Sequence, residues 1–193
     1  MTLTADDISR WFAAIPPAPS QQLDVSGVGS VAVKIDSVAA ALVPPAIRLT
    51  GVGTVTAATS LTGPASSPIS AMLTLGLVPT TNPDAILAAE LTLVAPPHVD
   101  LSGPLAFFGA VLNAALASFL GNFVRELMRP IVQQEIEDAA TRALSLVGLP
   151  PSVTLSIRKL SITPTSVTFQ PVLGALGTVL STYQPSASEV VTP

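Results

Sequence analysis

The chain has 193 residues, of which 49% are hydrophobic and only 10% are charged, and its net charge is −4. A typical soluble domain is about 25% charged, so the surface of this protein is expected to be weakly polar. Its eight basic residues are not clustered beyond Arg158-Lys159, so the basic patch that a phosphate backbone requires is missing. We therefore expect no nucleic-acid partner and no attraction to anionic membranes by charge.

The chain contains no cysteine, which excludes disulfide bonds, thiolate metal sites and a cysteine nucleophile. Its N-terminus carries Asp6 and Asp7 where a secretory signal would carry basic residues, and no apolar segment follows them. We expect a cytoplasmic location if this N-terminus is the native one. The longest apolar run, 104–120, is interrupted by Asn113 and Ser118 and falls short of the ~20 strongly apolar residues of a membrane span. No transmembrane segment is predicted.

Residues 4–15 predict a short helix that brings the only tryptophan of the chain. Thr4 can cap its N-terminus, acidic residues follow in the first turn, and Pro16-Pro17 end it. Trp11 and Phe12 lie on its apolar side. We expect them to plug one end of the core, and contact with a ligand or a partner is the alternative.

Four runs between residues 23 and 95 have the alternating hydrophobic pattern of strands. They cover 23–35, 47–61, 69–78 and 86–95. The cluster Pro79-Thr-Thr-Asn-Pro83 between the last two is typical of a turn that joins antiparallel strands. The sequence therefore predicts a meander of long antiparallel strands.

The first two runs each contain a Gly-Val-Gly segment, at residues 27–29 and 51–53. Both segments are too short for a dinucleotide-binding fingerprint, and each lies inside a predicted strand rather than at a strand-to-helix turn. Interior glycines mark bulges or sharp bends. Both strands are therefore expected to curve strongly.

The sequence contains no convincing catalytic constellation. His98 is the only histidine, it lies in the Pro-rich segment 96–101, and we expect a solvated or structural role for it rather than a place in a hydrolytic triad. The acidic residues Glu135, Glu137 and Asp138 fall on an outward helical face, where solvation is the usual explanation. We predict no metal site, no cofactor and no enzymatic activity.

Residues 105–147 have apolar positions at helical spacing for longer than an ordinary globular helix, after a Ser102-Gly103-Pro104 entry. This segment carries four of the six phenylalanines. An angle of about 100° per residue places a broad apolar face on its first half. The face comprises Leu112, Leu116, Phe119, Leu120, Phe123, Val124, Leu127 and Met128.

Two residues of this helix break its pattern. Asn113 lies near the middle of the apolar face, where an amide without partners is costly. We expect it to bond to a neighbouring backbone group, and contact with a ligand head group is the alternative. Pro130 cannot continue the hydrogen-bond ladder, so it should kink the helix or divide it in two. Gly148 and Pro150 should end the second half.

After the helix the chain returns to strand over 153–169, with a change of phase at Arg158-Lys159 that predicts a bulge. Residues 172–180 could form a short helix or a strand. Residues 181–193 form a polar tail that we expect to be flexible. The domain prediction is a single α+β domain over 1–180, followed by this tail.

In the order of its predicted elements and in their residue types, the chain resembles the tubular lipid-binding (TULIP) superfamily, which includes bactericidal permeability-increasing protein. The segments that carry the resemblance are Leu112-Asn-Ala-Ala-Leu-Ala-Ser-Phe-Leu-Gly-Asn-Phe-Val-Arg-Glu-Leu-Met-Arg-Pro130 through Val147 and the strand 152–169. The resemblance implies a long curved antiparallel sheet wrapped around a long kinked amphipathic helix, with an apolar groove for lipid. It does not extend to the family's disulfide or to a basic tip for lipopolysaccharide.

The first functional hypothesis is a non-enzymatic carrier or sensor of a lipid or other hydrophobic small molecule. Its expected ligand-binding residues are Trp11, Phe12, Phe108, Leu112, Asn113, Leu116, Phe119, Leu120, Phe123 and Leu127. The same residues would look identical in a filled, dry core. The alternative is therefore a structural or assembly protein that forms a homo-oligomer or joins a larger complex, since strand edges with few lysines are poorly defended against pairing. A hydrolase of lipid esters is a third hypothesis, for which no serine can be nominated.

Overall fold

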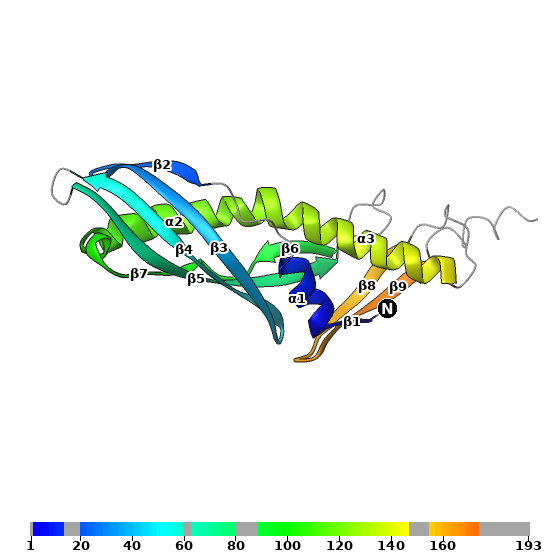
Figure 1. Ribbon diagram of the computed structural model, residues 1–193. Helices are drawn as coiled ribbons and strands as arrows, with labels where there is room; N and C mark the ends of the chain where they lie inside the picture. The colour runs from blue at the N-terminus through cyan, green and yellow to red at the C-terminus, as the bar shows by residue number, and fades with distance from the viewer. Residues whose placement is uncertain (1, 14–19, 60–62, 80–88, 147–154, 174–193) are drawn as a thin grey trace, which may run out of the picture.

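The computed structural model describes residues 2–13, 20–59, 63–79, 89–146 and 155–173. It shows the expected α+β fold, in which a strongly curled antiparallel sheet forms a half-barrel along one long helical segment (Figure 1). A short N-terminal helix packs on the larger sheet, between that sheet and the end of the molecule where the last strands lie (Figure 1). The predicted fold class is confirmed.

The larger sheet follows the order β2-β3-β4-β5-β6, and β7 pairs with β5 beyond this path. Its strands are β2 (Gln21–Val25), β3 (Gly29–Val43), β4 (Ala46–Thr59), β5 (Gly63–Pro79), β6 (Ala89–Leu93) and β7 (His98–Leu101). The three central strands have 14 to 17 residues each, far above the usual 5 to 6. Strands of this length accumulate a large twist, which curls the sheet.

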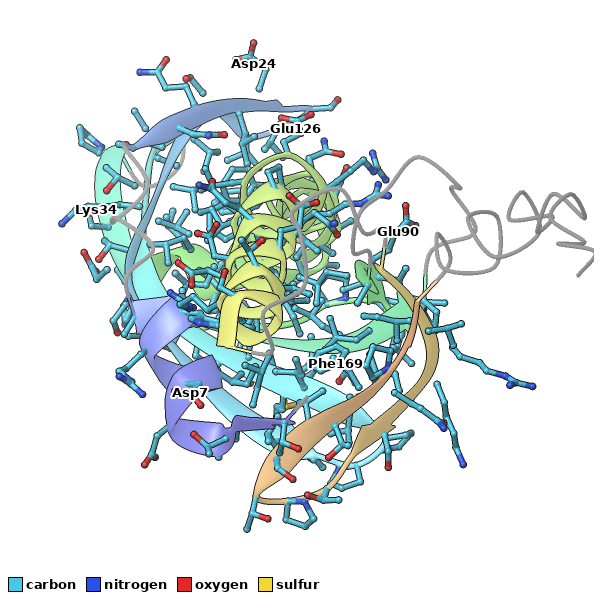
Figure 2. The ribbon with its side chains drawn as sticks, turned by 90° about the vertical axis from the view of Figure 1, so that its right-hand side faces the viewer. Asp7, Asp24, Lys34, Glu90, Glu126 and Phe169 are labelled. Carbon is cyan, nitrogen blue, oxygen red and sulfur yellow. The ribbon has the colours of Figure 1, made fainter. Side chains whose placement is uncertain are left out.

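A smaller sheet closes one end of the molecule, in the order β1-β9-β8. It joins β1 (Thr2–Thr4) to β8 (Leu155–Ile162) and β9 (Ser166–Leu173), so the N-terminal residues pair with the last described strand. The register of β8 and β9 shifts between Ile157 and Lys159, which confirms the predicted bulge. Phe169 of β9 is fully buried and points into this end of the core (Figure 2).

Helix α1 (Ala5–Ala13) begins as its sequence predicts. The carboxylate of Asp7 accepts hydrogen bonds from the Thr4 hydroxyl and amide, and the Asp7 amide donates to the Thr4 hydroxyl, which together form a capping box. These bonds from Thr4 lower the pKa of Asp7. Trp11 and Phe12 are buried, as expected of residues that plug one end of the core.

The long helical segment is continuous from residue 104 to residue 146 and has four parts. These are the 3-10 turn η1 (Pro104–Phe108), helix α2 (Gly109–Phe123), the π-helical turn η2 (Val124–Met128) and helix α3 (Arg129–Leu146). The segment runs along the concave side of the sheet, and Figure 2 views it nearly end-on inside the curl.

Pro130 does not divide the helix, because the wider π turn precedes it. A proline lacks the N–H and its ring crowds the carbonyl four residues earlier. The Arg129 amide donates to the Val124 carbonyl, five residues back, so the ladder has already widened before the proline. A π turn of this kind is a recognised way to accommodate an interruption inside an α-helix.

The core lies between the concave face of the sheet and the inward stripe of the long helical segment. Among the described residues, its most deeply buried members are Val31, Val33, Ile47, Leu49, Val55 and Leu75 from the sheet and Leu112, Leu116, Met128, Val132 and Ile136 from the helix. Together with the buried residues Phe119, Leu120, Phe123 and Val124, these helical positions recur every three or four residues, so one stripe continues through the π turn.

One exposed apolar region lies at the start of this segment. The Phe107 side chain is 81% exposed and Val111, one turn later, is 48% exposed. Among the described residues, one helix, Pro104–Arg142, is long and apolar enough by length and composition to cross a membrane. This is weak evidence for a span, because the core helix of a soluble protein passes the same test.

The predicted strand over 23–35 is wrong, because a tight turn at residues 26–28 divides it into β2 and β3. Gly27 and Gly29 have φ of 81° and 101°, a region that favours glycine, so they shape a hairpin rather than interior bulges. Leu23 faces Val31 across this hairpin. The hydrophobic alternation therefore continues in phase through the turn, and for this reason the sequence pattern does not reveal the turn.

Gly51 and Gly53 do lie inside a strand, opposite the point where β3 shifts register between Ile35 and Ser37. An added Cβ at Gly53 would lie 2.1 Å from the carbonyl oxygen of Lys34. The bulge therefore brings two backbones into contact that only glycine permits. The expectation of a sharp bend is confirmed for this strand.

Some predictions fall outside the described residues. These are the 79–83 turn beyond Pro79, Leu61, the helix end at Gly148 and Pro150, the 172–180 segment beyond Leu173, and the 181–193 tail. The domain boundary at residue 180 lies there too.

Gly53→Ala is expected to lower the free energy of unfolding by about 1–3 kcal/mol, because the new methyl group overpacks against the Lys34 backbone. Gly51→Ala is the matched control on the same strand, since its added Cβ would meet only ordinary contacts at 3.8 Å and beyond. Urea unfolding of both variants checks this. Equal stability of the two would contradict the close approach.

Candidate functional site

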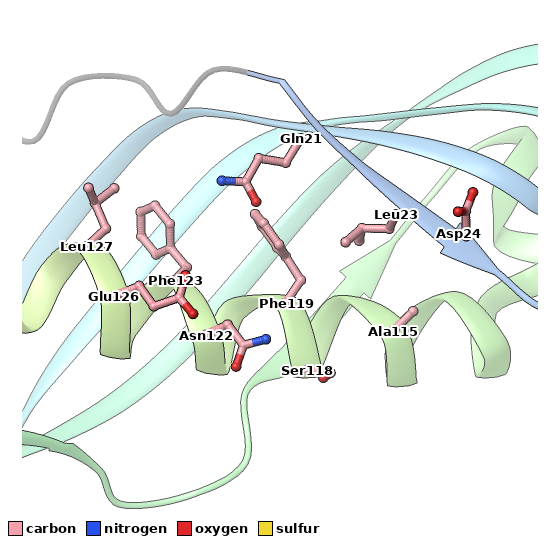
Figure 3. A pocket seen from close by; sticks show the side chains of 10 residues that line it. All are labelled: Gln21, Leu23, Asp24, Ala115, Ser118, Phe119, Asn122, Phe123, Glu126 and Leu127. Atoms are coloured by element: carbon pink, nitrogen blue, oxygen red, sulfur yellow. The ribbon is translucent and has the colours of Figure 1, made fainter.

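A groove of about 610 Å³ lies at the seam between β2 and the long helical segment (Figure 3). We call it the seam groove. The helix contributes Ala115, Ser118, Phe119, Asn122, Phe123, Glu126 and Leu127, and β2 contributes Gln21, Leu23 and Asp24. The helical members follow one another at three- and four-residue spacing, so they form a single stripe along α2 and η2.

The apolar wall of the seam groove is built on Phe119 and Phe123. Their ring centroids are 6.3 Å apart with an interplanar angle of 36°, which places the two rings one helical turn apart in a tilted pair. Each residue is less than a tenth exposed, so both rings are anchored in the core and leave only a small part of their surface to the groove. Leu23 and Leu127 extend this wall on either side of the seam.

Polar groups surround that wall. Gln21 and Asp24 come from β2, while Ser118, Asn122 and Glu126 come from the exposed side of the helix. The Arg125 guanidinium donates to Asn122 Oδ1 at 3.3 Å, and Arg125 itself does not line the groove. The groove therefore has an apolar wall, built on Phe119 and Phe123, and a polar rim.

The structure brings three of the predicted ligand-binding residues, Phe119, Phe123 and Leu127, into the seam groove. The remaining ones lie elsewhere. Leu112, Leu116 and Leu120 are buried in the core, where they face the sheet. Trp11 and Phe12 are buried on the inward side of α1. Phe108 is partly buried, and its ring makes an edge-to-face contact with exposed Phe107.

The sequence did not indicate Ala115, Ser118, Asn122 or Glu126 as groove residues, because their types are ordinary for the outer side of a helix. The angle from Phe119 and Phe123 places them at one border of the apolar face. Only the position of β2 turns that border into a groove wall. Gln21, Leu23 and Asp24 carry no signal of their own, since a strand pattern does not say which sheet edge meets the helix.

Asn113 lies outside the seam groove, and its Oδ1 is buried without a hydrogen-bond partner among the described residues. The expected bond to a neighbouring backbone group is therefore not made through this oxygen. A buried acceptor without a partner costs roughly 1–3 kcal/mol. Asn113 is thus a destabilising feature of the helix rather than part of the groove.

Within the described parts of the chain, no group of histidine, cysteine or acidic side chains could hold a metal ion. His98 of β7 lies 3.3 Å from Asp100, and both side chains are largely exposed. That placement agrees with a solvated role for the histidine. Neither residue lines the seam groove.

Comparison with known proteins finds no match for this sequence among protein-family models or among curated proteins.

Asn113→Ala is expected to raise the free energy of unfolding by about 1 kcal/mol more than Asn122→Ala does. Both changes improve helix propensity equally, but only the first removes a buried, unpartnered carbonyl. Thermal or urea unfolding of the two variants measures the difference. A lower stability for Asn113→Ala than for Asn122→Ala would show that the buried amide makes a favourable contact.

Proposed function

We propose that this protein is a non-enzymatic carrier or sensor that holds the apolar chain of a lipid-like molecule in the seam groove. The observation that carries the proposal is that one groove combines the apolar wall of Phe119 and Phe123 with a polar rim. Ligand sites are typically concave and mostly apolar, with a few polar groups that orient the ligand, and have volumes of roughly 300–1,000 Å³. The seam groove has a volume in this range, and it combines apolar and polar lining residues in equal numbers.

The alkyl chain of the ligand supplies the free energy of binding. Each methylene removed from water contributes about 0.8 kcal/mol, so ten methylenes contribute up to about 8 kcal/mol before the cost of ordering the ligand. The ring edges of Phe119 and Phe123 and the side chains of Leu23 and Leu127 offer the surface for this burial. Micromolar affinity corresponds to about 8.2 kcal/mol, so after the ordering cost a single alkyl chain should bind with a dissociation constant above the micromolar range.

On the side of the helix that faces the sheet, the described residues leave little side-chain surface for a ligand. Leu112 and Leu116 pack against the sheet with at most 1% of their surface exposed. The tubular lipid-binding proteins, which the chain resembles in the order of its elements, support the idea of a ligand between helix and sheet. For this chain we place that ligand at the seam with β2.

A second function, self-association or assembly into a larger complex, is favoured by the exposed Phe107 and Val111 side chains. They lie on a stretch, 101–124, that contains no charged residue. Exposed apolar surface of this kind often marks a protein–protein contact.

Ala115→Phe is expected to weaken binding of an alkyl chain at least about tenfold, because the added ring fills the seam groove. The measurement is displacement of the fluorescent probe N-phenyl-1-naphthylamine by dodecanol. Ala114→Phe is the matched control, since Ala114 is the neighbour of Ala115, is exposed and does not line the groove. Thermal unfolding of both variants verifies that they fold.

Equal affinity of the two variants for dodecanol would contradict the placement of the ligand. Absence of any probe binding or dodecanol binding by the unaltered protein would contradict the proposed function. The assembly function would then be the better supported one.

A further inference from the structure

We infer that two copies of this chain pair through the free edges of their β2 strands. In this pairing the two strands run antiparallel, and Leu23 of one copy lies opposite Leu23 of the other. The inference goes beyond the proposed function, because it needs no ligand in the seam groove. It follows from the position of β2 in the sheet, from its sequence and from the registers that are open to it.

β2 is an edge strand that the rest of the described structure leaves uncovered. It ends the larger sheet, and among the described strands it pairs with β3 alone. The long helical segment does not cover this edge, since the seam groove lies between β2 and α2 (Figure 3). The backbone N–H and C=O groups that point away from β3 therefore have no strand partner among the described residues, and they form a template for a further strand.

Two other edges of the described sheets have features that discourage such pairing. β8 ends the smaller sheet, and it carries a bulge at the basic residues Arg158 and Lys159. β6 ends the larger sheet on the other side, and the ion pair of Glu90 with Arg129 ties it to the helical segment. β2 contains no lysine and no proline, and its register with β3 has no bulge. Its edge is therefore open to pairing.

The residues of β2 alternate between two faces. Leu23 is half-buried and Val25 is buried, so these residues and Gln21 lie on the inward face. Gln22 and Asp24 are exposed on the outward face, and Figure 2 shows Asp24 pointing away from the helix. Residues directly opposite each other in an antiparallel pair share a face. Two copies that keep their inward faces on the same side of a joined sheet must therefore match inward residues with inward ones.

This condition and the charge of Asp24 select one register. A two-fold axis beside Asp24 would place the two Asp24 carboxylates directly opposite each other, where they repel. An axis beside Gln22 would leave Asp24 and Val25 opposite residues that lie outside β2. An axis beside Leu23 pairs all five residues of the strand and places each Asp24 opposite Gln22 of the other copy. The Gln22 amide can donate to that carboxylate, so β2 is complementary to itself in this register.

The paired surface is small, which sets the expected strength of the dimer. The pairing covers the exposed part of the two Leu23 side chains and joins two strands of five residues each. Stable complexes bury about 1,200 Å² or more, and smaller contacts are weak. We therefore expect a weak dimer whose population rises with protein concentration.

Single-cysteine variants of the full chain report the register directly, because the chain has no cysteine of its own. Leu23→Cys should form a disulfide-linked dimer under mild oxidation, since residues directly opposite each other have Cα atoms about 4.5–5.5 Å apart. Gln22→Cys mixed with ¹⁵N-labelled Asp24→Cys should give the mixed dimer about fivefold faster than either variant alone gives its own dimer. In a single variant the two cysteines are at best diagonal neighbours, about 7–8 Å apart, which a disulfide does not span.

Asp138→Cys is the control, because it places a thiol on the exposed side of α3 and so reports the rate of random collision. Mass spectrometry identifies the linked dimers, and circular dichroism verifies that each variant folds. Gln22 and Asp24 are exposed, so the mixed pair keeps the test valid even if Leu23→Cys loses stability.

Charge variants at Gln22 test the same register without a cross-link. Gln22→Lys places a cation opposite Asp24 of the other copy at two symmetric positions, so it should tighten the dimer about twofold or more. Gln22→Asp should weaken the dimer by a similar factor, because it places carboxylates opposite each other. Gln134→Lys and Gln134→Asp make the same charge changes at an exposed position of α3 and should leave the dimer unchanged. Sedimentation equilibrium measures the dimer dissociation constants.

Linking of Leu23→Cys and of the mixed pair no faster than Asp138→Cys would overturn the inference, as would equal effects of the Gln22 and Gln134 variants. Rapid linking of Gln22→Cys or Asp24→Cys alone would overturn the proposed register. None of these results bears on the binding of dodecanol to the unaltered protein, so the proposed function is tested separately.

Discussion

The fold depends on one packing requirement: the concave apolar face of the half-barrel must be covered, and the long helical segment covers it along its length while α1 and the smaller sheet close one end. A curled sheet with one open side cannot bury its inner face alone. Leu112, Leu116, Met128 and Ile136 provide the matching surface along the length of the curl. The helix therefore needs a stripe that continues from Leu112 to Ile136, which explains why Pro130 is accommodated by a π turn rather than by a break.

The seam groove follows from this requirement. A straight cylinder fits the middle of a curled sheet, where strands of 14 to 17 residues surround it. It fits less closely at β2, which has five residues and, among the described strands, pairs with β3 alone. The stripe at the border of the helix, from Ala115 to Leu127, is thus left partly uncovered. The same packing that stabilises the core leaves the apolar wall of Phe119 and Phe123 facing the seam groove.

The amino-acid pattern predicted the local features well and the long-range ones poorly. The helix over 105–147, the bulge at Arg158 and the bend at Gly53 each follow from periodicity or residue type near one position. The hairpin at residues 26–28 was missed because its alternation stays in phase. The groove residues of β2 were missed because a strand's own sequence does not encode which edge of the sheet it forms or what that edge meets.

The central claim is that an alkyl chain lies against the rings of Phe119 and Phe123. Intermolecular nuclear Overhauser effects between the methylenes of bound dodecanol and the aromatic protons of the protein test it most directly, because the chain has only six phenylalanines to distinguish. We expect contacts to the Phe119 and Phe123 rings and none to Phe12 or Phe169, which are buried elsewhere. Contacts confined to exposed Phe107 would contradict the claim.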